Sequence, residues 1–304
     1  MKTINLGLSG LEVPAVAVGC MRLNTIDKTA ADNFVKSALD MGANFFDNAD
    51  VYGDGVCEEI LSACLAGIKR SDIFIQSKVG IRKGAAFDFS KTHILDATEQ
   101  CLKRLRTDYL DVLLLHRPDI LVEPEEVAEA FGILAAQGKV RFFGVSNQNP
   151  PQIELLKKYV RQPLVANQLQ FSIAHAGMVS EGLHVNMNDE AAVNRNGGIL
   201  DYCRLHDITV QAWSPFQHGF FGGVFLDNPK FPELNRVIDE IAARHRSTNT
   251  AVALAWILRH PAKIQPVTGT MNARRLAECV KAAEITLTRD EWYAIYLAAG
   301  NILP

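Results

Sequence analysis

The chain has 304 residues, of which 48% are hydrophobic and 21% are charged, and its formal net charge at pH 7 is −3. A chain of this size can bury one large core, and α/β folds often reach this length as one domain, so we expect residues 1–304 to form a single domain. The near-neutral charge gives no electrostatic reason to expect nucleic acid or an anionic membrane as a partner.

The cysteines show neither a C-x-x-C pair nor the spacing of metal ligands; they are Cys20, Cys57, Cys64, Cys101, Cys203 and Cys279. Several fall in helix-like stretches, where a free thiol behaves as a small apolar residue, so we expect reduced thiols. The N-terminal residues lack the apolar core of a signal peptide, and no apolar run approaches the roughly twenty residues that span a bilayer. We therefore expect a cytoplasmic protein.

Strand-like and helix-like segments alternate along the chain. Two short runs at 3–6 and 11–13, separated by Gly7 to Gly10, predict an opening hairpin that would cover the closed bottom of a barrel. Eight further strand-like runs lie near residues 15–19, 43–47, 73–77, 110–115, 140–145, 164–168, 208–212 and 264–267. Amphipathic stretches with apolar residues at helical spacing separate them. This alternation predicts parallel strands closed into a (β/α)8 barrel, the TIM-barrel fold.

Two segments interrupt the alternation. Residues 171–198 lack clear periodicity, and we expect a long loop there that hangs over the barrel mouth. Residues 214–232 are rich in Gly and Phe. Their glycines, Gly219, Gly222 and Gly223, either let the backbone approach a ligand phosphate or only relieve a tight turn. After a last helix that begins at the capping box of Thr288 and Glu291, little chain remains to build a substrate pocket.

Four polar residues stand at or just after the ends of three predicted strands: Asp47, Tyr52, Lys78 and His116. The C-terminal ends of parallel strands face one mouth, so we expect these side chains to meet there. Each alone has a plain structural interpretation, such as a loop cap or a solvated strand end. Their joint placement instead favours a proton donor without a metal: Lys78 would lower the pKa of Tyr52, Asp47 would hold Lys78, and His116 would orient a carbonyl oxygen. Such a donor suits carbonyl reduction by a hydride.

In order and spacing, these four residues resemble the Asp, Tyr, Lys and His tetrad of the aldo-keto reductase family. Further matches are the Gly-Val-Ser-Asn segment at 144–147, the pair Asn167 and Gln168, and the Trp-Ser-Pro segment at 213–215. The resemblance covers nearly the whole chain. It implies a barrel enzyme that reduces an aldehyde or ketone with NADPH, with NADH as an alternative cofactor. Consistent with this, no G-x-G-x-x-G follows the first strand, so a doubly wound dinucleotide domain is unsupported.

The resemblance also implies how the cofactor would be held across the barrel mouth. Ser146, Asn147 and Gln168 would bind the carboxamide, and Trp213 would stack on the nicotinamide ring. Thr270 and Arg275 would meet the 2′-phosphate beside a helix N-terminus. Gly269 stands where the family often has lysine and Cys279 where it often has asparagine, which weakens the expectation of a strict NADPH preference. The other implied contacts are Gly19, Cys20, Met21, Asp47, Ser214, Pro215, Phe216, Gly219, Gly269, Glu278 and Cys279.

Two other kinds of protein remain as alternatives. A cofactor-sensing binding or regulatory subunit would use the same fold with little turnover, as channel-associated members of the resembled family do. A metal-dependent barrel hydrolase would need several ligands converging at strand ends, but no His-x-His follows a strand.

The sequence says less about the substrate and the assembly. An aromatic rim formed by Phe171, His175, Phe216 and Phe220 would favour an apolar or aromatic carbonyl compound. Nothing marks a self-complementary patch, and a monomer is expected.

Overall fold

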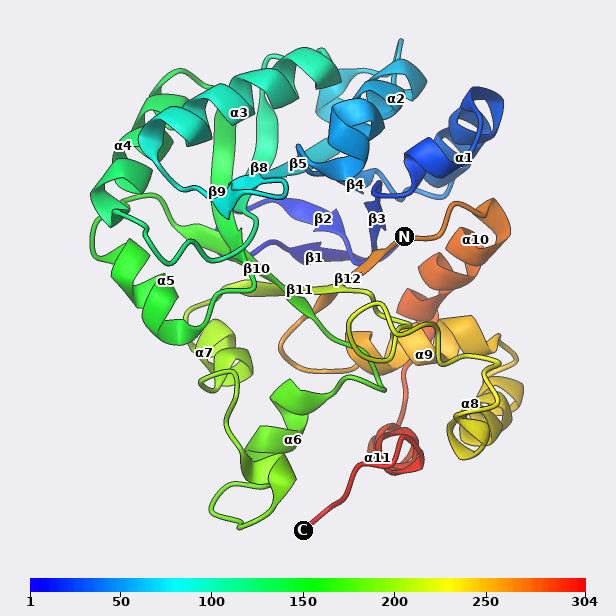
Figure 1. Cartoon of the computed structure of the whole chain (residues 1–304). Coiled ribbons are helices and arrows are strands. Elements are labelled where there is room, and N and C mark those ends of the chain that lie inside the picture. Colours follow the sequence, from blue (N-terminus) through cyan, green and yellow to red (C-terminus); the bar gives the residue numbers. More distant parts are fainter.

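The computed structural model describes all residues, 1–304, and its centre is a closed barrel of parallel strands (Figure 1). Around the barrel the order is β10-β11-β12-β3-β4-β5-β8-β9, so each strand pairs with the next one along the chain. The bounds are β3 Ala17–Gly19, β4 Phe45–Asp47, β5 Phe74–Val79, β8 Leu110–Leu115, β9 Val140–Ser146, β10 Leu164–Gln170, β11 Thr209–Trp213 and β12 Gln265–Thr268. Every barrel strand lies where the sequence predicts one, and the (β/α)8 fold is confirmed.

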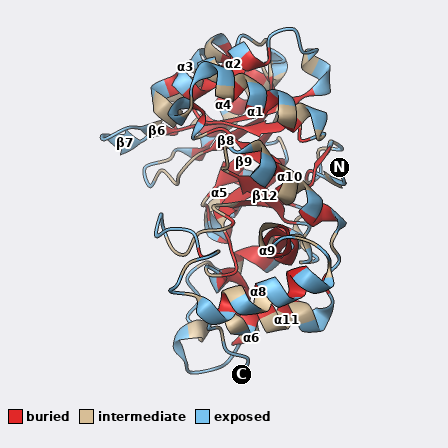
Figure 2. Cartoon of the chain, turned by 90° about the vertical axis from the view of Figure 1, so that its right-hand side faces the viewer, coloured by how far each residue is buried: buried red, intermediate tan, exposed pale blue.

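Helices surround the barrel and bury one face each, most of them against the strands and some against neighbouring helices (Figure 2). In α1, for example, Phe34, Val35 and Ala38 are buried on one face. The bounds are α1 Lys28–Asp40, α2 Val56–Cys64, α3 Lys91–Leu105, α4 Pro124–Ala136, α5 Pro150–Lys157, α6 Gly177–Leu183, α7 Ile199–Leu205, α8 Pro232–Arg244, α9 Asn249–Leu258, α10 Ala273–Lys281 and α11 Arg289–Ala298. The predicted capping box of Thr288 and Glu291 begins α11. No helix combines the length and the apolar character that crossing a membrane would require.

The N-terminal hairpin closes the bottom of the barrel. Its strands, β1 Thr3–Asn5 and β2 Glu12–Pro14, pair antiparallel, and Leu6 and Val13 pack into the small core cluster inside the barrel. Gly7 lies so close to the barrel that a Cβ there would stand 2.4 Å from the Val165 carbonyl oxygen. Its φ of +51° also disfavours other residues, so a glycine lets the hairpin sit tightly against the barrel.

A second, short hairpin marks the opposite end. Its strands are β6 Ile81–Arg82 and β7 Ala86–Phe87, directly after β5, and it projects from the body at the left of Figure 2, while the N-terminus lies at the right. The sequence does not predict this hairpin.

The expected loop at residues 171–198 is only partly a loop. It contains α6 and a 3₁₀ turn at Glu190–Ala192, and it packs beside α11 at the lower edge of Figure 1 rather than over the mouth. The Ser180 and Tyr296 hydroxyls lie 2.8 Å apart, and the His184 Nε2 lies 2.9 Å from the Ile302 carbonyl oxygen. The prediction was wrong because contacts with distant C-terminal residues, not a local apolar period, order this segment.

Candidate active site

The ends of β4, β5 and β8 bring the four predicted polar residues together. Asp47 ends β4, Lys78 lies one residue before the end of β5, and His116 directly follows β8. Tyr52 begins a 3₁₀ segment, Tyr52–Gly55, that carries the chain from β4 into α2. The Lys78 Nζ donates to the Asp47 Oδ2 at 2.8 Å and to the Tyr52 hydroxyl at 3.3 Å.

Lys78 is a fully buried ammonium that keeps its charge. It also donates to the Asn48 carbonyl oxygen at 2.8 Å, which completes three polar contacts. Burial acts to lower the Lys78 pKa, but the charge of Asp47 and the contact with Tyr52 outweigh it, so the pKa lies above its usual value. The arrangement therefore holds a positive charge beside the tyrosine at neutral pH.

Tyr52 differs from the sequence-based expectation. Burial raises the pKa of its hydroxyl above the usual value of about 10, and the opposing effect of Lys78 is smaller. The expected net lowering of this pKa by Lys78 is therefore not found. The phenol holds its proton at neutral pH, with an ammonium placed to stabilise the phenolate once the proton leaves.

His116 is held in its neutral form. Burial, with smaller effects from the charges of Lys78 and Arg117, lowers its pKa well below the usual value. Its ring meets the Tyr52 ring edge-on, with centroids 5.8 Å apart and an interplanar angle of 81°. Its Nδ1 atom is buried without a hydrogen-bond partner. A neutral imidazole in this position can donate one N–H to an oxygen that also meets the Tyr52 hydroxyl.

A layer of buried glutamines lies beside the tetrad inside the barrel. The Gln76 and Gln168 Nε2 atoms both donate to the Asp47 Oδ1, at 2.5 and 3.0 Å, and both also donate to the Gln211 Oε1. Gln211 in turn donates to Gln265, whose Nε2 donates to the Pro14 carbonyl oxygen at 2.7 Å. This chain of amides, here called the glutamine layer, fixes the Asp47 carboxylate and links it to the bottom hairpin.

The strand that carries Lys78 is tied to its neighbours on its outer side. The buried Glu58 of α2 accepts from the Ser77 hydroxyl at 2.6 Å and from the Arg104 Nε of α3 at 2.7 Å. Ser77 precedes Lys78, so this contact limits movement of the strand along its axis.

Above the tetrad lies a cavity of about 1060 Å³ at the barrel mouth. Most of the predicted cofactor residues line it: Gly19, Met21, Asp47, Ser146, Asn147, Gln168, Trp213, Ser214, Pro215, Phe216, Gly269, Thr270, Arg275 and Cys279. Tyr52 and His116 line it as well, whereas Lys78 lies behind Tyr52 with no exposed surface. The cavity is continuous from the tetrad to the beginning of α10.

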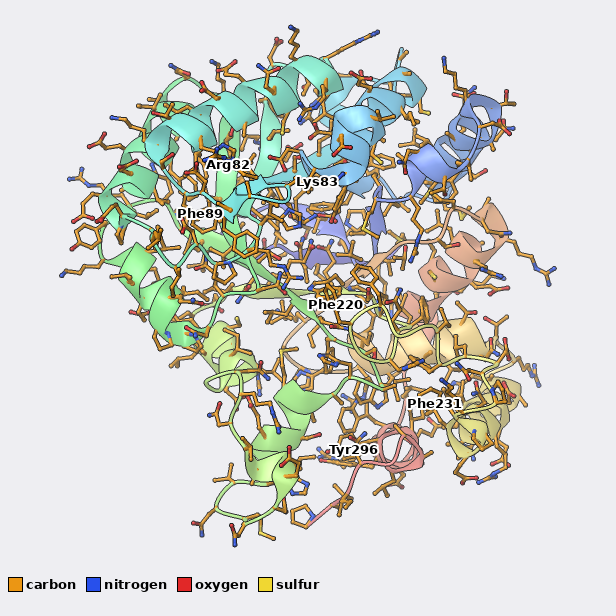
Figure 3. All side chains as sticks on the ribbon, viewed as in Figure 1. Arg82, Lys83, Phe89, Phe220, Phe231 and Tyr296 are labelled. Atoms are coloured by element: carbon orange, nitrogen blue, oxygen red, sulfur yellow. The ribbon has the colours of Figure 1, made fainter.

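Some predicted contacts do not line this cavity. Cys20 is buried, Glu278 lies on α10 near Arg274, and the carbonyl oxygen of Gly219 accepts a hydrogen bond from the Gln170 Nε2. The predicted aromatic rim is also divided. Phe216 and Phe220 line the cavity, with Phe220 on the loop after β11 (Figure 3), but Phe171 packs against Trp256 and His175 does not reach the cavity.

The residues at one end of the cavity fit a planar ring with a carboxamide. Asn147 has a φ of +58°, so the chain turns sharply after β9, and its Nδ2 donates to the Ser146 hydroxyl at 2.7 Å. Its Oδ1 accepts from the Trp213 Nε1 at 3.1 Å. Amide, hydroxyl and indole groups thus gather at the tetrad end of the cavity.

The other end fits phosphate groups. Thr270 and Arg275 line it, and the Asn272 side chain caps α10 by accepting from the Arg275 backbone N–H at 3.1 Å. The Arg22 Nη1 donates to the Gly269 carbonyl oxygen at 3.0 Å. A second guanidinium therefore lies beside Gly269, which stands where the resemblance often places lysine.

Sequence reasoning missed several residues that line the cavity, among them Arg117, Phe221, Asp227 and Thr250. The sequence could have indicated Arg117, because this residue directly follows His116 at the end of a predicted strand. The others lie on a loop and a helix with no pattern that points to the mouth. No group of three or more His, Cys, Asp or Glu side chains is arranged to hold a metal ion.

Comparison with known proteins gives consistent results. The sequence model of the aldo/keto reductase family matches residues 15–297. The uncharacterized oxidoreductase YcsN of Bacillus subtilis is 35% identical, over 95% of this chain and 95% of its own. A 6-dehydroglucose reductase of Novosphingobium aromaticivorans is 33% identical, over 98% of this chain and 96% of its own. A probable voltage-gated potassium channel subunit beta of Arabidopsis thaliana is 29% identical, over 94% of this chain and 92% of its own.

Solved structures agree. A thermostable aldo-keto reductase in complex with the inhibitor epalrestat matches with a TM-score of 0.80 and 28% identity, over 98% of this chain and 100% of that one. An aldo-keto reductase from Klebsiella pneumoniae in complex with NADPH matches with a TM-score of 0.77 and 25% identity, over 97% of this chain and 93% of that one.

Proposed function

Because the chain belongs to the aldo/keto reductase family, whose members use a nicotinamide cofactor, we propose that it reduces an aldehyde or ketone to the alcohol with NADPH. In this proposal Tyr52 is the general acid, and residues 1–304 act as one domain and as a monomer. The contact that carries the proposal is the Lys78 ammonium, 3.3 Å from the Tyr52 hydroxyl and 2.8 Å from the Asp47 carboxylate.

The proposed chemistry assigns one task to each tetrad residue. The cofactor, when bound, supplies a hydride to the carbonyl carbon. Tyr52 donates its proton to the carbonyl oxygen as negative charge develops there. Lys78 stabilises the phenolate that remains, and Asp47 keeps Lys78 charged and in place. Neutral His116 donates a hydrogen bond to the same oxygen and orients the carbonyl group.

The proposed cofactor position follows the cavity from the tetrad to α10. Ser146, Asn147 and Gln168 would hold the carboxamide and Trp213 would support the ring, which requires Asn147 and Gln168 to exchange part of their present hydrogen bonds. Arg22 and Arg275 at the other end support NADPH over NADH, since a guanidinium fork favours a phosphate over a bare ribose hydroxyl.

The direct test is to follow NADPH and NADH absorbance separately against a panel of aldehydes, ketones and dicarbonyl compounds. We expect turnover with several aldehydes and a kcat/KM for NADPH at least about tenfold above that for NADH, because a phosphate contact with arginine is charge-assisted. A chain that oxidises neither cofactor with any carbonyl compound would contradict the proposed function.

One observation favours a second candidate, a cofactor-sensing regulatory subunit. The relative in Arabidopsis thaliana is named a probable potassium channel subunit beta. Slow turnover in every assay together with tight NADPH binding and a stable protein partner would favour this role over the reductase.

A further inference from the structure

Arg117 is a cation at the mouth without an acidic partner. It directly follows His116, lines the cavity, and is half-buried. Its guanidinium carbon lies 5.7 Å from the centre of the Trp213 ring and 5.8 Å from that of Phe220. Burial lowers the pKa of Arg117 from its usual value, and the Tyr52 hydroxyl opposes this effect only in part. Arg117 forms no ion pair with any carboxylate of the chain.

The other charged side chains around the cavity do not neutralise the Arg117 guanidinium. Two carboxylates line the cavity, and one of them, Asp47, is taken by Lys78 and the glutamine layer. The other, Asp227, accepts from the Asn249 side chain at 3.2 Å. Arg22 is tied to the Gly269 carbonyl oxygen at the far end. Arg117 is therefore the unpaired charge nearest the reacting tetrad.

A half-buried guanidinium without a partner is costly, because it loses water without gaining an ion pair. Its contacts with Trp213 and Phe220 offset part of that cost and restrict the side chain, so the nitrogen fork is held in place before any ligand arrives. A planar fork of this kind matches a carboxylate, which it binds through two parallel hydrogen bonds.

We propose that Arg117 binds a carboxylate of the substrate, so that the preferred substrates are carbonyl compounds that also carry a carboxylate, such as oxo acids and aldehyde acids. This rests on the proposed reductase function and narrows its substrate class. It also replaces the earlier expectation of an apolar or aromatic substrate, which was based on an aromatic rim. Here the rings of Phe220 and Trp213 hold the Arg117 guanidinium in place. A single free fork favours a carboxylate over a phosphate dianion, which usually recruits more than one cation.

The test compares each acid with its neutral methyl ester at saturating NADPH. The pairs are glyoxylate, succinic semialdehyde and para-carboxybenzaldehyde against their esters. The variants are Arg117→Met, which keeps length and apolar packing, and Arg117→Lys, which keeps charge without the fork. Arg161→Met serves as the matched control, since Arg161 is exposed and does not line the cavity. A binding arm measures benzoate and benzamide on the NADPH-loaded protein by calorimetry, which needs no turnover.

For the wild-type chain we expect kcat/KM to favour the acid of at least one pair by about 10- to 100-fold, the range of a charge-assisted contact. Arg117→Met should remove most of that preference, mainly through KM, and Arg117→Lys should keep part of it. Arg161→Met should keep the wild-type preference. Benzoate should bind more tightly than benzamide, and Arg117→Met should abolish the difference.

The outcomes separate the two claims. If Arg117→Met lowers kcat/KM equally for acids and esters, the reductase function is supported. The carboxylate site is then overturned, and Arg117 has a packing role. If a phosphorylated aldehyde, assayed alongside the acids, gave the higher kcat/KM, the carboxylate site would be overturned as well. Without any turnover the reductase proposal fails, and benzoate binding that Arg117→Met does not weaken then overturns the carboxylate site independently.

Discussion

The Tyr52 hydroxyl keeps its proton because burial outweighs the neighbouring ammonium. The pKa of Tyr52 is raised, that of Lys78 is raised, and that of His116 is well below its usual value. All three groups therefore stand in the form that carbonyl reduction needs at neutral pH: a protonated phenol, a charged lysine and a neutral imidazole. Oxidation of an alcohol needs the phenolate and should be slower at the same pH.

These directions predict the pH dependence of kcat. Tyr52 loses its proton only as pH rises through a pKa above about 10, and His116 gains one only below its lowered pKa, so reduction should be nearly constant from about pH 7 to about pH 9. Oxidation of the alcohol should instead increase with pH over the same range. Steady-state kcat in both directions, with a carbonyl substrate and its alcohol, checks this. A reduction rate that falls with an apparent pKa near 7 contradicts it.

At the level of elements, the barrel strands determine where the negative charge of Asp47 is held. Gln76 on β5 and Gln168 on β10 reach Asp47 on β4 from two directions, and Gln211 on β11 joins them. An apolar layer would leave one oxygen of this buried carboxylate without a donor, which costs about 1–3 kcal/mol or more for a charged group. The glutamine layer thus positions Asp47, which in turn positions Lys78.

Replacing Gln76 with Leu tests this positioning. The variant removes the 2.5 Å donor to the Asp47 Oδ1, so we expect it to lose about 1–3 kcal/mol of unfolding free energy and about tenfold in kcat. The apparent pKa values of the kcat profile should also shift, which a purely structural loss would not cause.

Gln211→Leu is the control for Gln76→Leu, because it disturbs the same layer but leaves both donors to Asp47 in place. It should lower stability by a similar amount with a smaller loss of kcat and an unshifted pH profile. Equal effects of the two variants on the profile would show that Gln76 has no specific role. Urea denaturation and pH-dependent kinetics supply both measurements.

For the molecule as a whole, the barrel could be predicted because its signals are local. Each barrel strand is a short, largely apolar run that is mostly buried, and helices such as α1, α3 and α4 carry their own apolar stripes. The segment with α6 could not be predicted, since it is short, carries Gly177 and Gly182, and is ordered by contacts to α11 and the C-terminal residues. Elements stabilised by distant parts of the chain leave little trace in their own sequence.

The candidate site, like the fold, was predictable in part: the tetrad was predicted, but the glutamine layer was not. Convergence of strand ends brings the tetrad together, because parallel topology alone requires it. The glutamine layer was missed because polar residues inside apolar strands look like ordinary interruptions of a run. The direction of the Tyr52 pKa was also wrong, since sequence identifies the neighbouring cation but cannot weigh it against burial.

Hydride transfer in Tyr52→Phe tests the role of the phenol directly when it is measured in a single turnover with saturating NADPH and a carbonyl substrate. Phenylalanine keeps the ring that packs edge-on against His116 and removes only the hydroxyl. We predict a rate about 10²- to 10⁴-fold lower, with NADPH binding nearly unchanged. A variant that transfers the hydride at the wild-type rate would show that Tyr52 does not supply the proton.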